Sequence, residues 1–117
     1  MSRDLLFLLP SGFYDNKRWE YCPECAEIWG VLAYYPSIKE GLDIHFQPID
    51  KPRHDLVERL GDKNQNCPTL ILAKDSPVVE NCGIMKKSGY NFINNSSDIG
   101  LYWAARYGTA HPRGHAR

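Results

Sequence analysis

Short apolar runs along the chain predict a buried sheet. Leu5 to Leu9 is uninterrupted until Pro10, and Thr69 to Ala73 is almost wholly apolar. Runs of this length are typical of central strands that are covered on both faces. The stretch from Leu42 to Gln47 alternates apolar and polar residues, which predicts a strand at the sheet margin. Tyr90 to Ile93 completes the predicted set of four strands.

Three segments have apolar residues at helical spacing. The first begins at Cys22-Pro23, where a first-turn proline is well tolerated, and stops before Pro36. A short helix ends at Gly61, and the last helix starts near Ser96. The predicted order is β-α-β-α-β-β-α, an α/β fold with a four-stranded mixed sheet. Residues 13–21 and 74–89 are expected to be loops, with one candidate strand at Val78-Val79.

Composition narrows the functional classes without naming one. The chain has 117 residues, enough for one core, which we place at residues 1–108, followed by a flexible tail at 109–117. Fourteen basic and fourteen acidic side chains balance, which argues against a nucleic-acid partner. No apolar run approaches the roughly 20 residues of a membrane span, and none suits a signal peptide. We therefore expect a cytoplasmic protein with no membrane partner.

The strongest local motif is Tyr21-Cys22-Pro23-Glu24-Cys25. A three-residue step places both sulfurs on one side of the first helical turn, close enough for a disulfide. The helix N-terminus favours a thiolate at the first cysteine, whereas the second lies deeper and is shielded. Cys22 is therefore the predicted attacking thiol, and Cys25 the thiol that resolves a mixed disulfide.

A second motif, Cys67-Pro68, directly precedes the third predicted strand. If that strand runs antiparallel to the first, Cys67 lies beside the thiol pair. A cis peptide bond at Pro68 would turn the Cys67 backbone outward, where its N–H and C=O could pair with an extended peptide. Cys67 and Pro68, together with Tyr21 and Pro23, are accordingly predicted substrate-binding residues.

With these motifs in place, the sequence resembles the thioredoxin-like superfamily, in its glutaredoxin and glutathione-transferase N-terminal branch. The landmarks are Cys-Pro-Glu-Cys at 22–25, Pro-Thr-Leu-Ile-Leu at 68–72, and the segment from Ile93 to Gly108. More narrowly, residues 4–108 look like a small bacterial thioredoxin-like family whose function is not established. The resemblance implies a three-layer sandwich and a redox activity.

The same resemblance implies a binding site for glutathione. In that branch, the residue pair that opens the last helix holds the γ-glutamyl end of glutathione, and Asn95 and Ser96 occupy those positions here. A helix N-terminus with a hydroxyl group suits a carboxylate. Asn95 replaces the acidic member of the pair, which removes a charge partner for the glutathione amine. The resemblance thus makes glutathione one candidate co-substrate, with the Asn95 replacement counting against it, and no resident cofactor is expected.

Three functions follow from these motifs. The first is a thiol–disulfide oxidoreductase, or glutathione-linked redox protein, that acts on a disulfide in a small molecule or a protein. The second is a non-catalytic thioredoxin-like module that binds a peptide or partner. The third is a zinc or iron–sulfur protein with Cys22, Cys25 and Cys67 as ligands and Cys82 as a fourth, although no second Cys-x-x-Cys motif accompanies them. The oligomeric state has no signal in the sequence.

Overall fold

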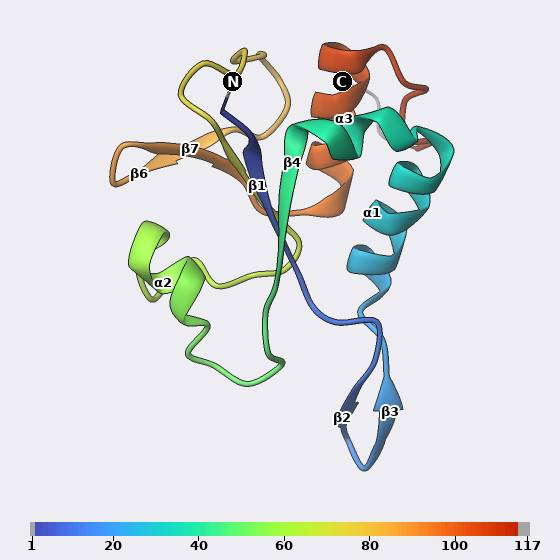
Figure 1. The fold of residues 1–117 in the computed structure, drawn as a ribbon, viewed down its shortest axis with the longest axis vertical. Coiled ribbons are helices and arrows are strands. Elements are labelled where there is room, and N and C mark those ends of the chain that lie inside the picture. Colours follow the sequence, from blue (N-terminus) through green and yellow to red (C-terminus); the bar gives the residue numbers. More distant parts are fainter. Residues whose placement is uncertain (1, 115–117) are drawn as a thin grey trace.

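A computed structural model describes residues 2–114. Its main sheet has five strands in the order β4-β1-β5-β7-β6 (Figure 1). The bounds are β1 Asp4–Leu8, β4 Leu42–Phe46, β5 Thr69–Leu72, β6 Met85–Lys87 and β7 Tyr90–Ile93. β1 pairs with β4 in parallel, and every other neighbouring pair is antiparallel. The fold is therefore a mixed α/β fold.

The helices have the places that the sequence pattern predicts. α1 (Pro23–Tyr34) and the 3₁₀ helix η1 (Pro36–Gly41) connect the parallel strands β1 and β4, which need a crossover of this kind. α2 (His54–Leu60) follows β4, and α3 (Ser96–Tyr107) follows β7. α1 and α3 lie together on one side of the sheet, and α2 lies on the other (Figure 1).

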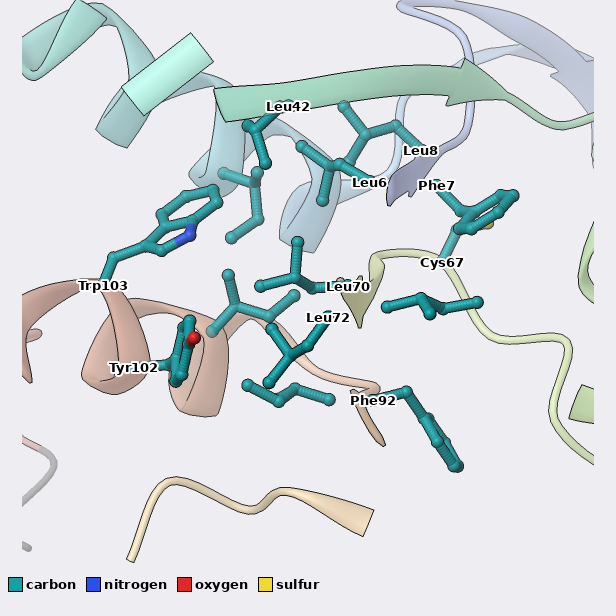
Figure 2. Packing of buried hydrophobic residues seen from close by; sticks show 14 of the residues in the cluster. Leu6, Phe7, Leu8, Leu42, Cys67, Leu70, Leu72, Phe92, Tyr102 and Trp103 are labelled. Carbon is teal, nitrogen blue, oxygen red and sulfur yellow. The ribbon is translucent and has the colours of Figure 1, made fainter. Parts of the chain in front are cut away.

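The core lies between the sheet and these helices. Leu6, Leu70 and Leu72 are buried and point toward Tyr102 and Trp103 of α3 (Figure 2). Phe7 and Phe92 point away from that layer, to the opposite face of the sheet (Figure 2). The Arg59 guanidinium of α2 lies 5.7 Å from the centre of the Phe7 ring. Because both faces of β1 are covered, its sequence is a continuous apolar run.

The prediction of four strands was wrong, because two hairpins carry little apolar signal. β6 is exposed at all three of its residues and pairs with β7 at the sheet edge. β2 (Phe13–Asp15) and β3 (Arg18–Glu20) form a separate two-stranded sheet where a loop was expected. No strand forms at Val78-Val79.

Both hairpins use two-residue turns with positive φ angles. Asn16 and Lys17 have φ angles of 51° and 62°, and Ser88 and Gly89 have φ angles of 53° and 83°. Positive φ at both central residues is the mark of a type I′ turn, whose twist matches that of the strands it joins. Asparagine adopts this conformation more readily than most residues, so Asn16 was the missed signal.

Residues 109–113 lie beside α1 and α3. The Ala110 N–H donates to the Tyr35 hydroxyl at 3.1 Å. A methyl group added to Gly100 of α3 would be 2.7 Å from Cγ of Pro112, so this position requires glycine. The predicted tail also includes residues 115–117, which lie outside the described residues.

Candidate functional site

The predicted attacking thiol occupies the N-cap of α1. Cys22 has extended backbone angles, and its Sγ accepts the N–H of Cys25 at 3.3 Å. Pro23 follows in the first helical turn, where its missing N–H costs nothing. The Cys22 side chain is half-buried, whereas Cys25 is 3% exposed. One sulfur therefore faces the surroundings at the positive end of the helix, and the other lies beneath it.

Cys25 is held as a neutral thiol. Burial raises its pKa well above the ordinary value, and the nearby Cys22 and Cys67 thiols raise it further. The Leu9 N–H donates to Cys25 Sγ at 3.4 Å, and this hydrogen bond lowers the pKa of Cys25. A buried thiol of this kind is inert until an electrophilic sulfur is formed next to it.

Cys67 lies on the other side of Cys22. The Cys67–Pro68 peptide bond is cis. The Cys22 S–H donates to the Cys67 carbonyl oxygen, with a donor–acceptor distance of 3.9 Å. Thr69, two residues further on, pairs with Phe7 near the end of the antiparallel strand β1. The antiparallel pairing of β1 and β5 therefore brings Cys67 to the thiol pair, as its position in the sequence predicts.

A buried arginine stands beside Cys67. Arg53 is 6% exposed, and its guanidinium donates to three backbone carbonyls: Pro48 at 2.9 Å from Nε, Ile49 at 2.8 Å and Gln65 at 2.7 Å. Burial raises the pKa of Cys67 to about 11, while the charge of Arg53 lowers that pKa. Sequence reasoning missed Arg53, because nothing local distinguishes it from a surface arginine.

A small cavity opens at the thiol pair. Its volume is about 240 Å³. It is lined by Leu9, Pro10, Ser11, Tyr21, Cys22, Cys25, Ala26 and Trp29. The predicted binding residue Tyr21 thus lines the space beside both sulfurs, and so does Trp29 of α1. A larger cavity of about 490 Å³ between α1 and residues 109–113 has no cysteine in its lining, so the smaller cavity is the one that adjoins the thiol pair.

The β2–β3 hairpin projects from the body of the molecule (Figure 1), and its flanking residues Ser11 and Tyr21 line this cavity. Tyr14 and Trp19 are exposed on it and meet edge to face, with ring centres 6.5 Å apart. Tyr21 follows the hairpin and is 64% exposed. An open hollow of about 510 Å³ extends from Trp19 across Tyr21 to Pro23. Two exposed aromatic rings therefore lie on the hairpin, and a third, that of Tyr21, lies between the hairpin and Cys22.

The predicted glutathione-binding residues are engaged by the protein itself. Asn95 caps α3 by accepting the Asp98 N–H at 2.9 Å. The Ser96 N–H donates to the Glu24 carboxylate at 3.1 Å. Ser96 is 3% exposed, and its hydroxyl lies 3.3 Å from the carboxylates of both Glu24 and Glu27. A residue inside the Cys-Pro-Glu-Cys motif thus covers the N-terminus of α3.

The remaining sequence-based hypotheses concern metals and membranes. Among residues 2–114, no group of three or more His, Cys, Asp and Glu side chains is placed to hold a metal ion. Cys82 is buried. Within the same part of the chain, no helix has the length and apolar character needed to cross a bilayer.

Residues 3–111 match the family described as a protein of unknown function, DUF3088. The chain belongs to this family. No curated protein and no solved structure matches the chain. Membership in DUF3088 agrees with the expectation of a family without an established function, and it leaves the chemistry to be argued from the residues.

Proposed function

We propose that this DUF3088 protein is a thiol–disulfide oxidoreductase in which Cys22 attacks and Cys25 resolves. One observation carries the proposal. The half-buried Cys22 sulfur caps α1 and accepts the N–H of a buried Cys25 at 3.3 Å. Dithiol exchange requires two such unequal thiols, one accessible and one shielded, within reach of each other.

The reaction proceeds in two exchanges. The Cys22 thiolate attacks one sulfur of a substrate disulfide, and the other sulfur leaves as a thiolate and takes up a proton. Cys25 then loses its proton and attacks Cys22, which forms the Cys22–Cys25 disulfide and releases the second substrate thiol. The substrate is reduced by two electrons and the pair is oxidised by two. An external dithiol returns the pair to its reduced form.

The scaffold that we propose is thioredoxin-like, in line with the sequence resemblance. Four strands in the order β4-β1-β5-β7, with only β1 and β4 parallel, support it. α1 and α3 on one side of the sheet and α2 on the other supply the three layers. On this interpretation β6 and the β2–β3 hairpin are additions to the common scaffold.

Glutathione has weaker support as the co-substrate than a dithiol. The Ser96 N–H, which would bind the glutathione carboxylate, donates to Glu24 instead. A glutathione carboxylate would have to displace Glu24 and would then lie beside its charge and that of Glu27. We therefore propose that the pair accepts electrons from a dithiol more readily than from glutathione.

The test is catalysis of insulin reduction by dithiothreitol. Wild-type protein is expected to accelerate the reduction, and Cys22→Ala is expected to abolish the acceleration, because the attacking sulfur is gone. Cys82→Ala is the matched control, since it removes a buried cysteine that the reaction does not use. Equal activity of Cys22→Ala and wild type, or no activity in either, would contradict the oxidoreductase.

The second candidate is a non-catalytic module that binds a partner. The exposed rings of Tyr14, Trp19 and Tyr21 favour it, since aromatic side chains are enriched at protein interfaces. Alkylation of native protein with iodoacetamide separates the two candidates. The oxidoreductase predicts that Cys22 reacts faster at neutral pH than a free model thiol such as glutathione, whereas a purely binding module predicts that Cys22 reacts more slowly than that thiol.

A further inference from the structure

The Cys22 sulfur has two thiol neighbours, and they differ in their surroundings. Cys25 lies beneath it in α1, and Cys67 lies across from it before β5. The Cys22 sulfur lies 3.9 Å from the carbonyl oxygen of Cys67, and a charge on Cys22 raises the pKa of the Cys67 thiol. Both Cys25 and Cys67 are almost completely buried, at 3% and 6% exposure.

The cation of Arg53 distinguishes the two neighbours. A thiol that resolves a mixed disulfide must lose its proton as it attacks, so a nearby positive charge assists it. The Arg53 guanidinium donates to the Gln65 carbonyl at 2.7 Å, two residues before Cys67, and its positive charge lowers the pKa of Cys67. The interaction that favours a negative charge on Cys25 is a single backbone N–H, from Leu9 at 3.4 Å.

Arg53 has no carboxylate to neutralise it. Of residues 2–114, only Arg3, Arg18 and Arg106 form ion pairs with acidic side chains. The Arg53 guanidinium is held by neutral carbonyls of Pro48, Ile49 and Gln65. Its positive charge therefore remains available to a negative charge that develops at Cys67.

We propose that Cys67 is a second resolving thiol for Cys22 and that Arg53 stabilises the Cys67 thiolate during its attack. The proposal rests on the proposed function, because it needs a mixed disulfide at Cys22. Cys67 releases its proton to water and attacks the Cys22 sulfur. A Cys22–Cys67 disulfide forms, and the substrate thiolate leaves and takes up a proton. Cys25 can then exchange with Cys67 at Cys22, and an external dithiol reduces the resulting disulfide.

The test uses Ellman's reagent at one equivalent with Cys25→Ser protein. Attack by Cys22 releases one thionitrobenzoate and leaves the other bound in a mixed disulfide. Cys67 is expected to release the second thionitrobenzoate, and peptide mapping without reductant is expected to find Cys22 joined to Cys67. In Cys25→Ser/Cys67→Ala the second release is expected to be lost. Cys25→Ser/Cys82→Ala is the matched control and is expected to retain it.

The outcomes separate this inference from the oxidoreductase itself. If no first release occurs, Cys22 does not react and the proposed function fails. If the first release is normal and the second is equally slow in Cys25→Ser and Cys25→Ser/Cys67→Ala, only the role of Cys67 is overturned. Circular dichroism of each variant checks that it is folded, and Cys67→Ser repeats the test with a side chain of nearly the same size.

A pair of substitutions tests Arg53 in the Cys25→Ser protein. Loss of a nearby cation raises a thiol pKa by about one unit. The thiolate fraction then falls about tenfold, while the remaining thiolate becomes about threefold more nucleophilic, so Arg53→Gln is expected to slow the second release about threefold. Arg53→Lys is expected to restore the rate, and the pH profile of the release is expected to move to higher pH in Arg53→Gln alone. Equal rates and profiles in the two variants would overturn the electrostatic role.

Discussion

Two buried charges, Asp4 and Arg53, stand near opposite ends of the β1–β5 strand pair. Asp4 is 1% exposed and lies next to an opposite charge, the Arg106 guanidinium, at 2.6 Å. It also accepts the Ala73 N–H at 2.7 Å and the Ser76 hydroxyl at 2.6 Å. Arg53 is held by carbonyls alone. Neutralisation at Asp4 fixes β1, the 73–76 turn and α3 in place, whereas the charge of Arg53 extends to a neighbouring thiol.

The largest effect on stability is expected at Asp4, whose charge is neutralised by Arg106. Asp4→Ala leaves the Arg106 cation without its partner, and breaking a buried pair from one side costs about 3–5 kcal/mol. Urea denaturation is expected to show this loss, while the alkylation rate of Cys22 in the folded protein stays unchanged. Asp43→Ala is the matched control, because it breaks the exposed Arg3–Asp43 pair and is expected to cost less than about 1 kcal/mol. Equal losses would mean that burial of the pair is unimportant.

The next effect is the pH dependence that Cys67 contributes. Burial raises its pKa from 9.0 to about 11 in the folded protein. The unfolded chain therefore loses this proton first as the pH rises. Cys67 therefore makes its full contribution to the free energy of unfolding below about pH 9. That contribution is lost as the pH rises from about 9 to about 11. At about 1.4 kcal/mol per pKa unit, the loss is about 3 kcal/mol.

The check is urea denaturation from neutral pH to about pH 11, with reductant, for wild type and Cys67→Ala. The difference between them removes the titration of lysines and of the other thiols. The free energy of unfolding of wild type is expected to fall more steeply across this range. Parallel curves would show that Cys67 ionises in the folded protein as easily as in the unfolded chain.

A smaller effect on stability is expected at Arg53. Arg53→Gln withdraws the donors from three carbonyls, and unsatisfied buried groups cost about 1–3 kcal/mol each, although the loops around them can admit water. We expect a total loss of about 1–3 kcal/mol in urea denaturation. Unlike Asp4→Ala, this substitution is also expected to alter thiol chemistry. If Arg53→Gln loses stability but leaves the pH profile of Cys67 unchanged, then Arg53, like Asp4, acts on stability alone.

The smallest effect is expected at Glu24. Its carboxylate lies at the N-terminus of α3, where a negative charge is worth about 0.3–1 kcal/mol. Glu24→Gln is expected to lower the unfolding free energy by that amount, and Glu58→Gln on α2 is the control at an exposed position. The same substitution is expected to increase the rate with glutathione relative to dithiothreitol. If the ratio of the glutathione rate to the dithiothreitol rate is unchanged, the Ser96 amide does not take part in glutathione binding.

The sequence predicted the elements whose buried positions follow a regular pattern along the chain. The apolar runs of β1 and β5 and the helical spacing in α1 and α3 are local patterns, so they can be read without tertiary information. β6 escaped detection because all of its residues are exposed. The β2–β3 hairpin escaped because the turn at Asn16-Lys17 lacks the glycine that usually marks one.

For the site, the sequence predicted the positions of Cys22, Cys25 and Cys67 but not their partners. Cys22 and Cys25 share one helical turn, and the antiparallel pairing of β1 and β5 brings Cys67 to them. Arg53 reaches Cys67 only because its loop folds around it. The contact of Glu24 with Ser96 spans 72 residues, and no local pattern encodes it.

That contact ties the first turn of α1 to the first turn of α3. Glu24 stands between the two cysteines in the chain, so a disulfide that tightens this turn pulls on the hydrogen bond to the Ser96 amide. Amide hydrogen exchange at Ser96 would then differ between the oxidised and reduced forms. The redox state of the protein could be followed from the backbone of a distant helix, with every sulfur left unlabelled.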